Sequence, residues 1–127
     1  MKTTILRECI RLAKKKNPSL DNQFRHFSFI IQKNKIIEWG TNISKANPLT
    51  MFGYSNRSGI HAETNAYAKA KGILDKNESF ETVNIRLNKS GDLKLSKPCP
   101  CCYSFLESFG CTSVWFSTEA GFAKLTF

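Results

Sequence analysis

Long hydrophobic runs, export signals and repeats are all missing from this sequence. Its longest apolar stretches have the length of a strand and are too short to cross a membrane. The opening stretch MKTTILRECIRLAKKK has basic residues on both sides of a short apolar segment and no small-residue cleavage site, which indicates a helix and not a signal peptide. Without repeats, linkers or low-complexity segments, the 127 residues predict one domain over 1–127. We expect a cytoplasmic protein that does not bind membranes.

Pairs of cysteines suited to disulfides are also lacking, although the chain has five cysteines. Disulfides are rare in the reducing compartment that the missing export signal implies. Three of the five cysteines lie within residues 99–102, and such close spacing predicts metal chemistry instead.

Acidic residues are scarce. Nineteen Lys and Arg face ten Asp and Glu, for a formal net charge of +9, which favours anionic partners such as phosphates or nucleic acid. The lysines are scattered along the chain, however, and only residues 14–16 form a run. A solvated, lysine-rich surface is therefore the alternative interpretation.

Hydrophobic periodicity predicts three helices and five strands. Helices are expected over 3–16, from 61 to about 72–75, and from Pro98 to Gly110. Strands are expected over 26–32, 35–39, 83–87, 114–117 and 122–127. Residues 33–34 are expected to form a hairpin turn. Residues 41–60 are expected to form a long irregular loop, and loops of that length in a compact domain usually have a functional role. Only residues 118–121 separate the last two strands, too few for a crossover helix, so the last strand must run antiparallel to the fourth.

Two short motifs lie at the start of the second and third predicted helices. The first is His61-Ala62-Glu63, and the second is Pro98-Cys99-Pro100-Cys101-Cys102, about thirty-five residues later. Either motif alone is weak evidence, but the pair matches the H-x-E and P-C-x-x-C signature of zinc-dependent nucleobase deaminases.

The chemistry of such a site explains the residue types. Cys99 and Cys102 are three apart and share a helix face, and the first turn of a helix favours thiolates. With the imidazole of His61 they make three zinc ligands, which leaves a fourth position for water, as in catalytic zinc sites. Glu63 is the nearby carboxylate that can move protons between the water, the ring nitrogen and the leaving amine.

Several alternatives stay open for these residues. The C-x-x-C could be half of a four-ligand structural zinc site, although Cys9 and Cys111 form no second pair. His61 and Glu63 could be ordinary residues of a first helical turn. Cys101 could replace Cys102 as the partner of Cys99, but residues two apart on a helix face different directions, so a small buried residue is the expected role of Cys101.

On these motifs and this order of elements, the chain resembles the cytidine deaminase superfamily over most of its length. The resemblance implies a three-layer α/β fold, with a mixed five-stranded sheet flanked by helices and zinc between the second and third helices. It also implies hydrolytic deamination, with cytosine as the first expectation, giving uracil and ammonia.

The resemblance also suggests substrate contacts. Asn42 matches the asparagine that binds the substrate sugar in family members, although a turn residue is the alternative. Phe52, Tyr54 and Trp115 are candidate pocket walls, for which ordinary packing is the alternative, and Ala62 is a further candidate substrate-binding residue.

Two features separate branches of the superfamily. HAETNA resembles deoxycytidylate deaminases, whereas the short terminal hairpin resembles the branch that contains free cytidine deaminases and several toxin and phage deaminases. The APOBEC group and the tRNA adenosine deaminases place a helix before the last strand, which this chain cannot do. Lys97 directly precedes the Pro-Cys pair, where family members often have Ser or Thr, and Ser96 lies one residue further back.

The first functional expectation is a deaminase of a cytosine nucleoside or nucleotide. The second is a deaminase of cytosine in single-stranded DNA or RNA, which the basic balance and the aromatic loop containing Arg57 favour. A third is an inactive deaminase fold used as a binding module, against which the intact Glu63 argues. The sequence leaves a monomer and a homo-oligomer equally open.

Overall fold

The computed structural model describes residues 3–17, 25–42 and 61–127. Their elements are α1 (Thr3–Lys16), β1 (His26–Gln32), β2 (Lys35–Thr41), α2 (Ala62–Ala70), β3 (Phe80–Leu87), β4 (Leu93–Lys94), α3 (Pro100–Ser108), β5 (Cys111–Thr118) and β6 (Gly121–Thr126). No helix of these described ranges is long and apolar enough to cross a membrane.

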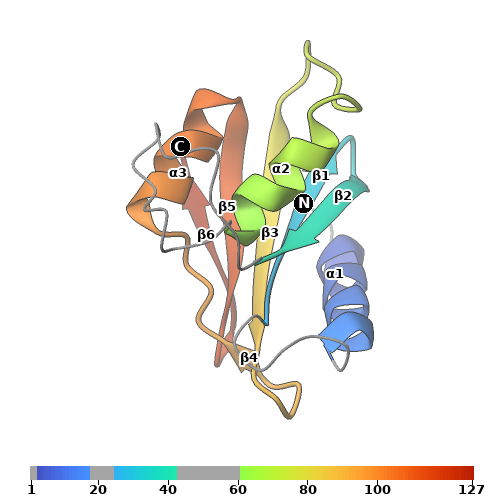
Figure 1. Ribbon diagram of the computed structural model, residues 1–127, viewed down its shortest axis with the longest axis vertical. Coiled ribbons are helices and arrows are strands. Elements are labelled where there is room, and N and C mark those ends of the chain that lie inside the picture. The colour runs from blue at the N-terminus through green and yellow to red at the C-terminus, as the bar shows by residue number, and fades with distance from the viewer. Residues whose placement is uncertain (1–2, 18–24, 43–60) are drawn as a thin grey trace.

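The strands form one mixed sheet in the order β2-β1-β3-β5-β6 (Figure 1). Only the β3–β5 pair is parallel among the described pairs, and β6 runs antiparallel to β5, as the short connection requires. A two-residue strand, β4, also pairs with β3 after the connection formed by residues 88–92. The sequence analysis did not predict it, because two residues are too few to show an alternating pattern.

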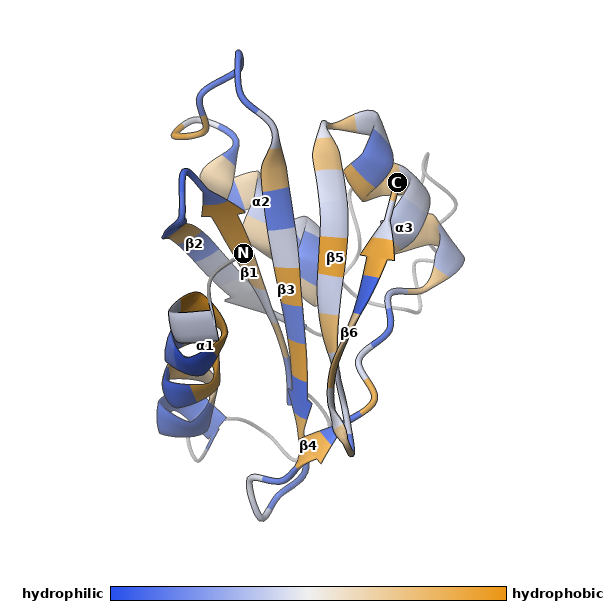
Figure 2. Cartoon of the chain, turned by 180° about the vertical axis from the view of Figure 1, so that it is seen from behind, coloured by the Kyte–Doolittle hydropathy of each residue, from blue (hydrophilic) through white to orange (hydrophobic). Residues whose placement is uncertain are grey.

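Helices cover both faces of the sheet, which makes the three layers expected of an α/β fold. The apolar side of α1 meets one face of β1 and β3, and Figure 2 shows the charged side of α1 turned outwards. On the other face, Ala66 and Ala70 of α2 and Phe105 and Leu106 of α3 pack against Ile30 and Val114. The strand β1 is buried almost throughout because it has a helix layer on each side.

Close approach of α2 to the sheet depends on small residues. Ala62, Ala66 and Ala70 are fully buried. Gly40 of β2 lies so near that a Cβ there would come within 2.7 Å of the backbone nitrogen of Ala66. The glycine therefore sets the distance between β2 and α2.

The ends of the helices differ in part from expectation. The α2 helix stops at Ala70, so Ile73 lies outside it and is 62% exposed. The α3 helix begins with Pro100, not Pro98, because Cys99 has extended backbone angles and caps the helix. Gly110, which follows α3, has a φ of 95°, in agreement with the predicted glycine stop. At the β1–β2 hairpin, Lys33 and Asn34 both have positive φ, as a two-residue turn of this kind requires.

Candidate active site and metal centre

The start of α2 and the start of α3 carry the two sequence motifs to one place. His61 immediately precedes α2 and has an extended backbone. Cys99 caps α3, and its Sγ accepts a hydrogen bond from the backbone nitrogen of Cys102 at 3.4 Å. Pro100 has a fixed φ and no amide hydrogen, which suits the first position of a helix. The proline thus helps to point both thiols in one direction.

Three side chains form a compact cluster at this point. The Nδ1 atom of His61 lies 3.2 Å from Sγ of Cys102 and 3.5 Å from Sγ of Cys99, and all three atoms lie within 4.8 Å of one another. A tetrahedral zinc ion with ordinary bond lengths separates such nitrogen and sulfur ligands by about 3.6 Å. One imidazole and two sulfurs with this spacing fit a zinc ion.

The charge state of the cluster also suits a cation. Hydrogen bonds from Cys102 and then from His61 lower the pKa of the Cys99 thiol to about 4. The hydrogen bond with Cys99 in turn raises the pKa of His61. Because its pKa is lowered, Cys99 favours the thiolate form, and a metal at this point would meet a negatively charged ligand.

Cys101 lies between the two clustered cysteines in sequence but is not in the cluster. It is half-buried, and the described residues that converge on one point are His61, Cys99 and Cys102. All five cysteines are in the described ranges, and none of them forms a disulfide. The geometry therefore favours Cys102 over Cys101 as the partner of Cys99.

Glu63 lies in the first turn of α2, two residues after His61. Its side chain is only 2% exposed, which is unusual for a carboxylate. It interacts electrostatically with His61 and with His26. A buried carboxylate next to the candidate metal centre can hold and release protons where water is scarce.

Asn42 follows β2 and lies against the start of α2. Its Oδ1 accepts a hydrogen bond from the backbone nitrogen of Ala62 at 2.7 Å. Nearby, Nδ2 of Asn65 donates to the carbonyl of Thr41 at 2.9 Å. These two bonds join the end of β2 to the H-x-E motif. Asn42 and Ala62 are thus at the site, while their contacts with a sugar and a base remain predictions.

The structure describes only one of the three aromatic residues predicted to line the pocket, Trp115. Phe52, Tyr54 and the basic Arg57 lie outside the described residues. Trp115 belongs to the opposite face of the sheet, where it packs with the α1 core and its Nε1 donates to Glu81 at 2.8 Å. Its neighbour Val114 points to the α2 and α3 side instead. Successive side chains of a strand point to opposite faces of the sheet, so Trp115 lies on the face away from the metal cluster. The expectation that Trp115 lines the pocket is therefore wrong.

Sequence reasoning missed His26, the first residue of β1. It precedes Ser28 and Ile30 on the sheet face that bears α2 and α3. Its buried Nε2 atom has no hydrogen-bond partner among the described residues. Burial lowers the pKa of His26, and Glu63, His61 and Cys99 act on it electrostatically. The available signal was that the chain has only two histidines, of which His61 is the other.

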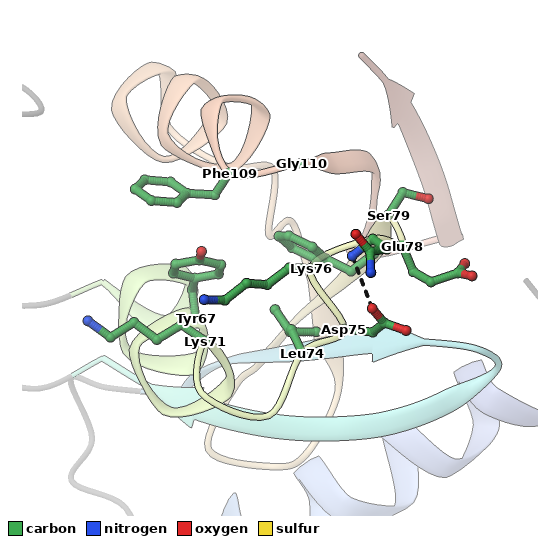
Figure 3. A pocket seen from close by; sticks show the side chains of 11 residues that line it. Tyr67, Lys71, Leu74, Asp75, Lys76, Glu78, Ser79, Phe109 and Gly110 are labelled. Carbon is green, nitrogen blue, oxygen red and sulfur yellow. Dashed lines mark hydrogen bonds between the residues drawn. The ribbon is translucent and has the colours of Figure 1, made fainter.

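A cavity of about 500 Å³ opens elsewhere, at the carboxyl ends of α2 and α3 (Figure 3). Tyr67 and Phe109 line it together with the charged residues Lys71, Lys76 and Asp75. The metal cluster is at the opposite ends of the same two helices. This cavity is therefore separate from the candidate active site.

Solved structures of other proteins have the same arrangement of helices and strands as this chain. No protein-family model and no curated protein matches the sequence. Among solved structures, the dCMP deaminase from the cyanophage S-TIM5, in complex with dCMP and dUMP, is 19% identical with a TM-score of 0.63 over 91% of this chain and 82% of that chain. The cytidine deaminase from Burkholderia pseudomallei is 16% identical with a TM-score of 0.65 over 99% and 93%.

A third structure, the cytidine deaminase from Mycobacterium leprae, is 15% identical with a TM-score of 0.55 over 92% of this chain and 87% of that chain. The similarity in each case extends over nearly the whole of both chains. This chain therefore has the fold of the cytidine deaminases.

Proposed function

We propose that this protein is a zinc-dependent hydrolase that converts cytosine to uracil in a nucleoside or nucleotide and releases ammonia. The observation that carries the proposal is the cluster of His61, Cys99 and Cys102 at two helix starts, with the buried Glu63 beside it. In a deaminase fold, this combination supports catalysis better than a purely structural metal site, because three ligands leave one position open.

The ligands and the carboxylate have separate tasks. His61, Cys99 and Cys102 would hold the zinc ion, which supplies an acidified water molecule near neutral pH. Glu63 would take one proton from water and deliver it to the ring nitrogen of the base. Glu63 would then take the second proton from the oxygen now bonded to the ring carbon and pass it to the exocyclic amine, so that the carbon–nitrogen bond breaks and ammonia leaves.

Substrate contacts belong to the same proposal. Asn42 binds the sugar, and Ala62, whose amide donates to Oδ1 of Asn42, is a further substrate contact. The dCMP and dUMP bound to the similar cyanophage enzyme support a nucleotide substrate. The second candidate is cytosine in single-stranded nucleic acid, which the net charge of +9 favours. An intracellular location is part of the proposal because all five cysteines are outside disulfides.

A substrate panel tests the proposal. Purified protein is incubated with cytidine, deoxycytidine, their monophosphates and a cytosine-containing oligonucleotide, and each product is identified by mass spectrometry. Metal content is measured by elemental analysis of the same sample. Conversion of a free nucleoside or monophosphate supports the first candidate. Conversion of the oligonucleotide alone would replace it with the second, and no conversion of any cytosine compound by zinc-loaded protein would refute both.

A further inference from the structure

A second cavity, of about 430 Å³, lies where β3 ends and β4 begins. Its lining includes four cations and one carboxylate, namely Arg25, Arg86, Lys89, Lys94 and Glu119. Lys94 and Glu119 form an ion pair at 3.2 Å, and the lining as a whole carries more positive than negative charge. Such a concave surface attracts an anion far more strongly than scattered surface lysines do.

The groups at the cavity suit a phosphate. Arg86 and Lys89 are both exposed, and none of the ion pairs among the described residues includes either of them. The guanidinium of arginine can bind phosphate oxygens through two parallel hydrogen bonds. Leu95 also lines the cavity and is 57% exposed, which adds an apolar surface beside the cations.

Sheet register connects this cavity to the candidate active site. Arg86 of β3 is directly opposite His26 of β1, so both side chains project from the same face of the sheet. That face is the one covered by α2 and α3. His26 faces Glu63 and His61 closely enough to interact with them electrostatically, and Arg86 acts on His26 in the same way. Arg86 and the candidate metal cluster are thus on one side of the sheet.

A buried hydrogen-bond network holds the segment between the cavity and the candidate metal cluster in place. Oγ of Ser96 donates to the carbonyl of Asn84 at 2.9 Å and accepts from the backbone nitrogen of Ser117 at 2.7 Å. Four residues lead from Leu95, in the cavity wall, to Cys99, so their Cα atoms are at most about 14 Å apart. Since Ser96 is held between β3 and β5, the cavity is a fixed neighbour of the site.

We propose that this cavity binds a phosphate group of the substrate, which makes the enzyme selective for nucleotides over nucleosides. The inference rests on the proposed function and extends it to the class of substrate. The phosphate belongs either to a mononucleotide or to a single-stranded polynucleotide whose target cytosine occupies the metal site. Both sources present the same anion to Arg86 and Lys89.

The test compares two double variants that remove the same charge. R86Q/K89Q alters the cationic cavity, and K71Q/K76Q alters exposed lysines of the separate cavity in Figure 3. The ratio of kcat/KM for deoxycytidine monophosphate to that for deoxycytidine is measured, with a cytosine-containing oligonucleotide as a further arm. We expect R86Q/K89Q to lower the ratio for one phosphate source at least tenfold and K71Q/K76Q to leave it within twofold. The source whose ratio falls is the substrate.

Direct binding supplies a readout that does not need turnover. Anisotropy of a labelled oligonucleotide is measured over a range of salt concentrations, and calorimetry is used for deoxycytidine monophosphate. For a polynucleotide, loss of one neutralised phosphate should reduce the slope of log K against log salt by about 0.7. Equal effects of the two double variants, or no effect of R86Q/K89Q on either ratio or on binding, would overturn the proposal.

Failure of this inference can be told apart from failure of the proposed function. If wild-type protein deaminates nucleosides and nucleotides with equal efficiency and R86Q/K89Q does the same, the cavity proposal is wrong and the deaminase proposal stands. The opposite result is that wild-type protein deaminates nothing but binds the phosphate compounds, and that this binding is lost in R86Q/K89Q and kept in K71Q/K76Q. Phosphate binding by the cavity then stands, and the deaminase proposal is wrong.

Discussion

Neighbouring cysteines in this protein have different environments at the scale of single residues. The side chains of Cys99 and Cys102 meet at His61, while Cys101, between them, is outside that cluster. The difference arises because Cys99 caps α3 and Cys102 lies in its first turn, so that they share one side of the helix. Position on the helix, more than residue type, decides which thiol can bind a metal.

Zinc content should separate these cysteines. We expect about one zinc per wild-type chain, with content sharply reduced in C99A and C102A and retained in C101A. Each ligand substitution removes one of three protein ligands, whereas C101A removes none. Elemental analysis after dialysis measures the ratio, and circular dichroism checks that each variant is folded. Equal loss in C101A would show that the ligand assignment is wrong.

Glu63 should be needed for turnover and not for the metal. In E63Q the amide has almost the same shape as the carboxylate but cannot take up a proton. We expect zinc content and thermal stability close to wild type, and a fall in kcat of roughly a hundredfold to ten-thousandfold, which is the usual contribution of general acid–base catalysis. Substantial residual turnover would remove Glu63 from the proton transfers, and loss of zinc would give it a structural role instead.

At the scale of helices and strands, the contact between β2 and α2 determines where the H-x-E motif lies in the molecule. Asn42 after β2 holds the amide of Ala62, and Asn65 of α2 holds the carbonyl of Thr41. These bonds require the helix and the strand to approach closely, which the absence of a side chain at Gly40 permits. The site therefore depends on a residue that takes no part in the chemistry.

Substitution of Gly40 should be costly. In G40A, the new Cβ would lie 2.7 Å from the backbone nitrogen of Ala66 and 2.9 Å from Nδ2 of Asn65, so the helix or strand must shift. Overpacking of this kind usually lowers the free energy of unfolding by about 1–3 kcal/mol. Urea unfolding of G40A measures the loss.

Gly72 offers a matched control for G40A. A Cβ at Gly72 has no heavy atom within 4 Å, and its backbone does not have positive φ. G72A should therefore leave stability unchanged or raise it by up to about 1 kcal/mol, because alanine restricts the unfolded chain. Equal stability of G40A and G72A would mean that α2 moves away from β2 without cost.

On the scale of the whole molecule, the sheet separates two cores, and each contains a buried thiol. Cys9 lies in the core beneath α1, and Cys111 lies in the core beneath α2 and α3. Burial raises the pKa of Cys9 to about 12 and that of Cys111 to about 11, from an ordinary value of 9.0. Above about pH 9, both cores thus keep a neutral thiol where an unfolded chain would have a thiolate.

This difference predicts a loss of stability in alkaline solution. The unfolded chain loses both protons near pH 9 while the folded chain keeps them, so deprotonation favours unfolding. The contribution of these thiols is fully present below pH 9 and declines as the pH rises towards 11 and 12. The decline is about 1.4 kcal/mol per pH unit for each proton.

A double variant isolates the two thiols from other groups that titrate in this range. Unfolding of wild type and of C9A/C111A is measured by urea from pH 8 to about pH 11 under reducing conditions. We expect the free energy of unfolding to fall more steeply with pH in wild type than in C9A/C111A. Parallel pH profiles of the two proteins would show that the buried thiols do not set the alkaline limit.

Much of the fold and the core of the candidate site could be predicted from local patterns in the sequence. Helical spacing located α1, and the four-residue connection before β6 determined the direction of the last strand, because both depend on neighbours in the chain. The two motifs predicted His61, Cys99 and Cys102 for the same reason: ligand spacing within a helix turn is a local property.

Only the tertiary structure decided what depends on contacts between distant segments. It put Trp115 on the α1 side of the sheet, because strand order and core packing determine which face of β5 meets which helix. It also placed β1 beside β3, which brought His26 opposite Arg86 and next to the candidate active site. No local pattern joins residues sixty positions apart, so the sequence by itself predicted the candidate metal ligands, and the fold decided which further side chains lie around them.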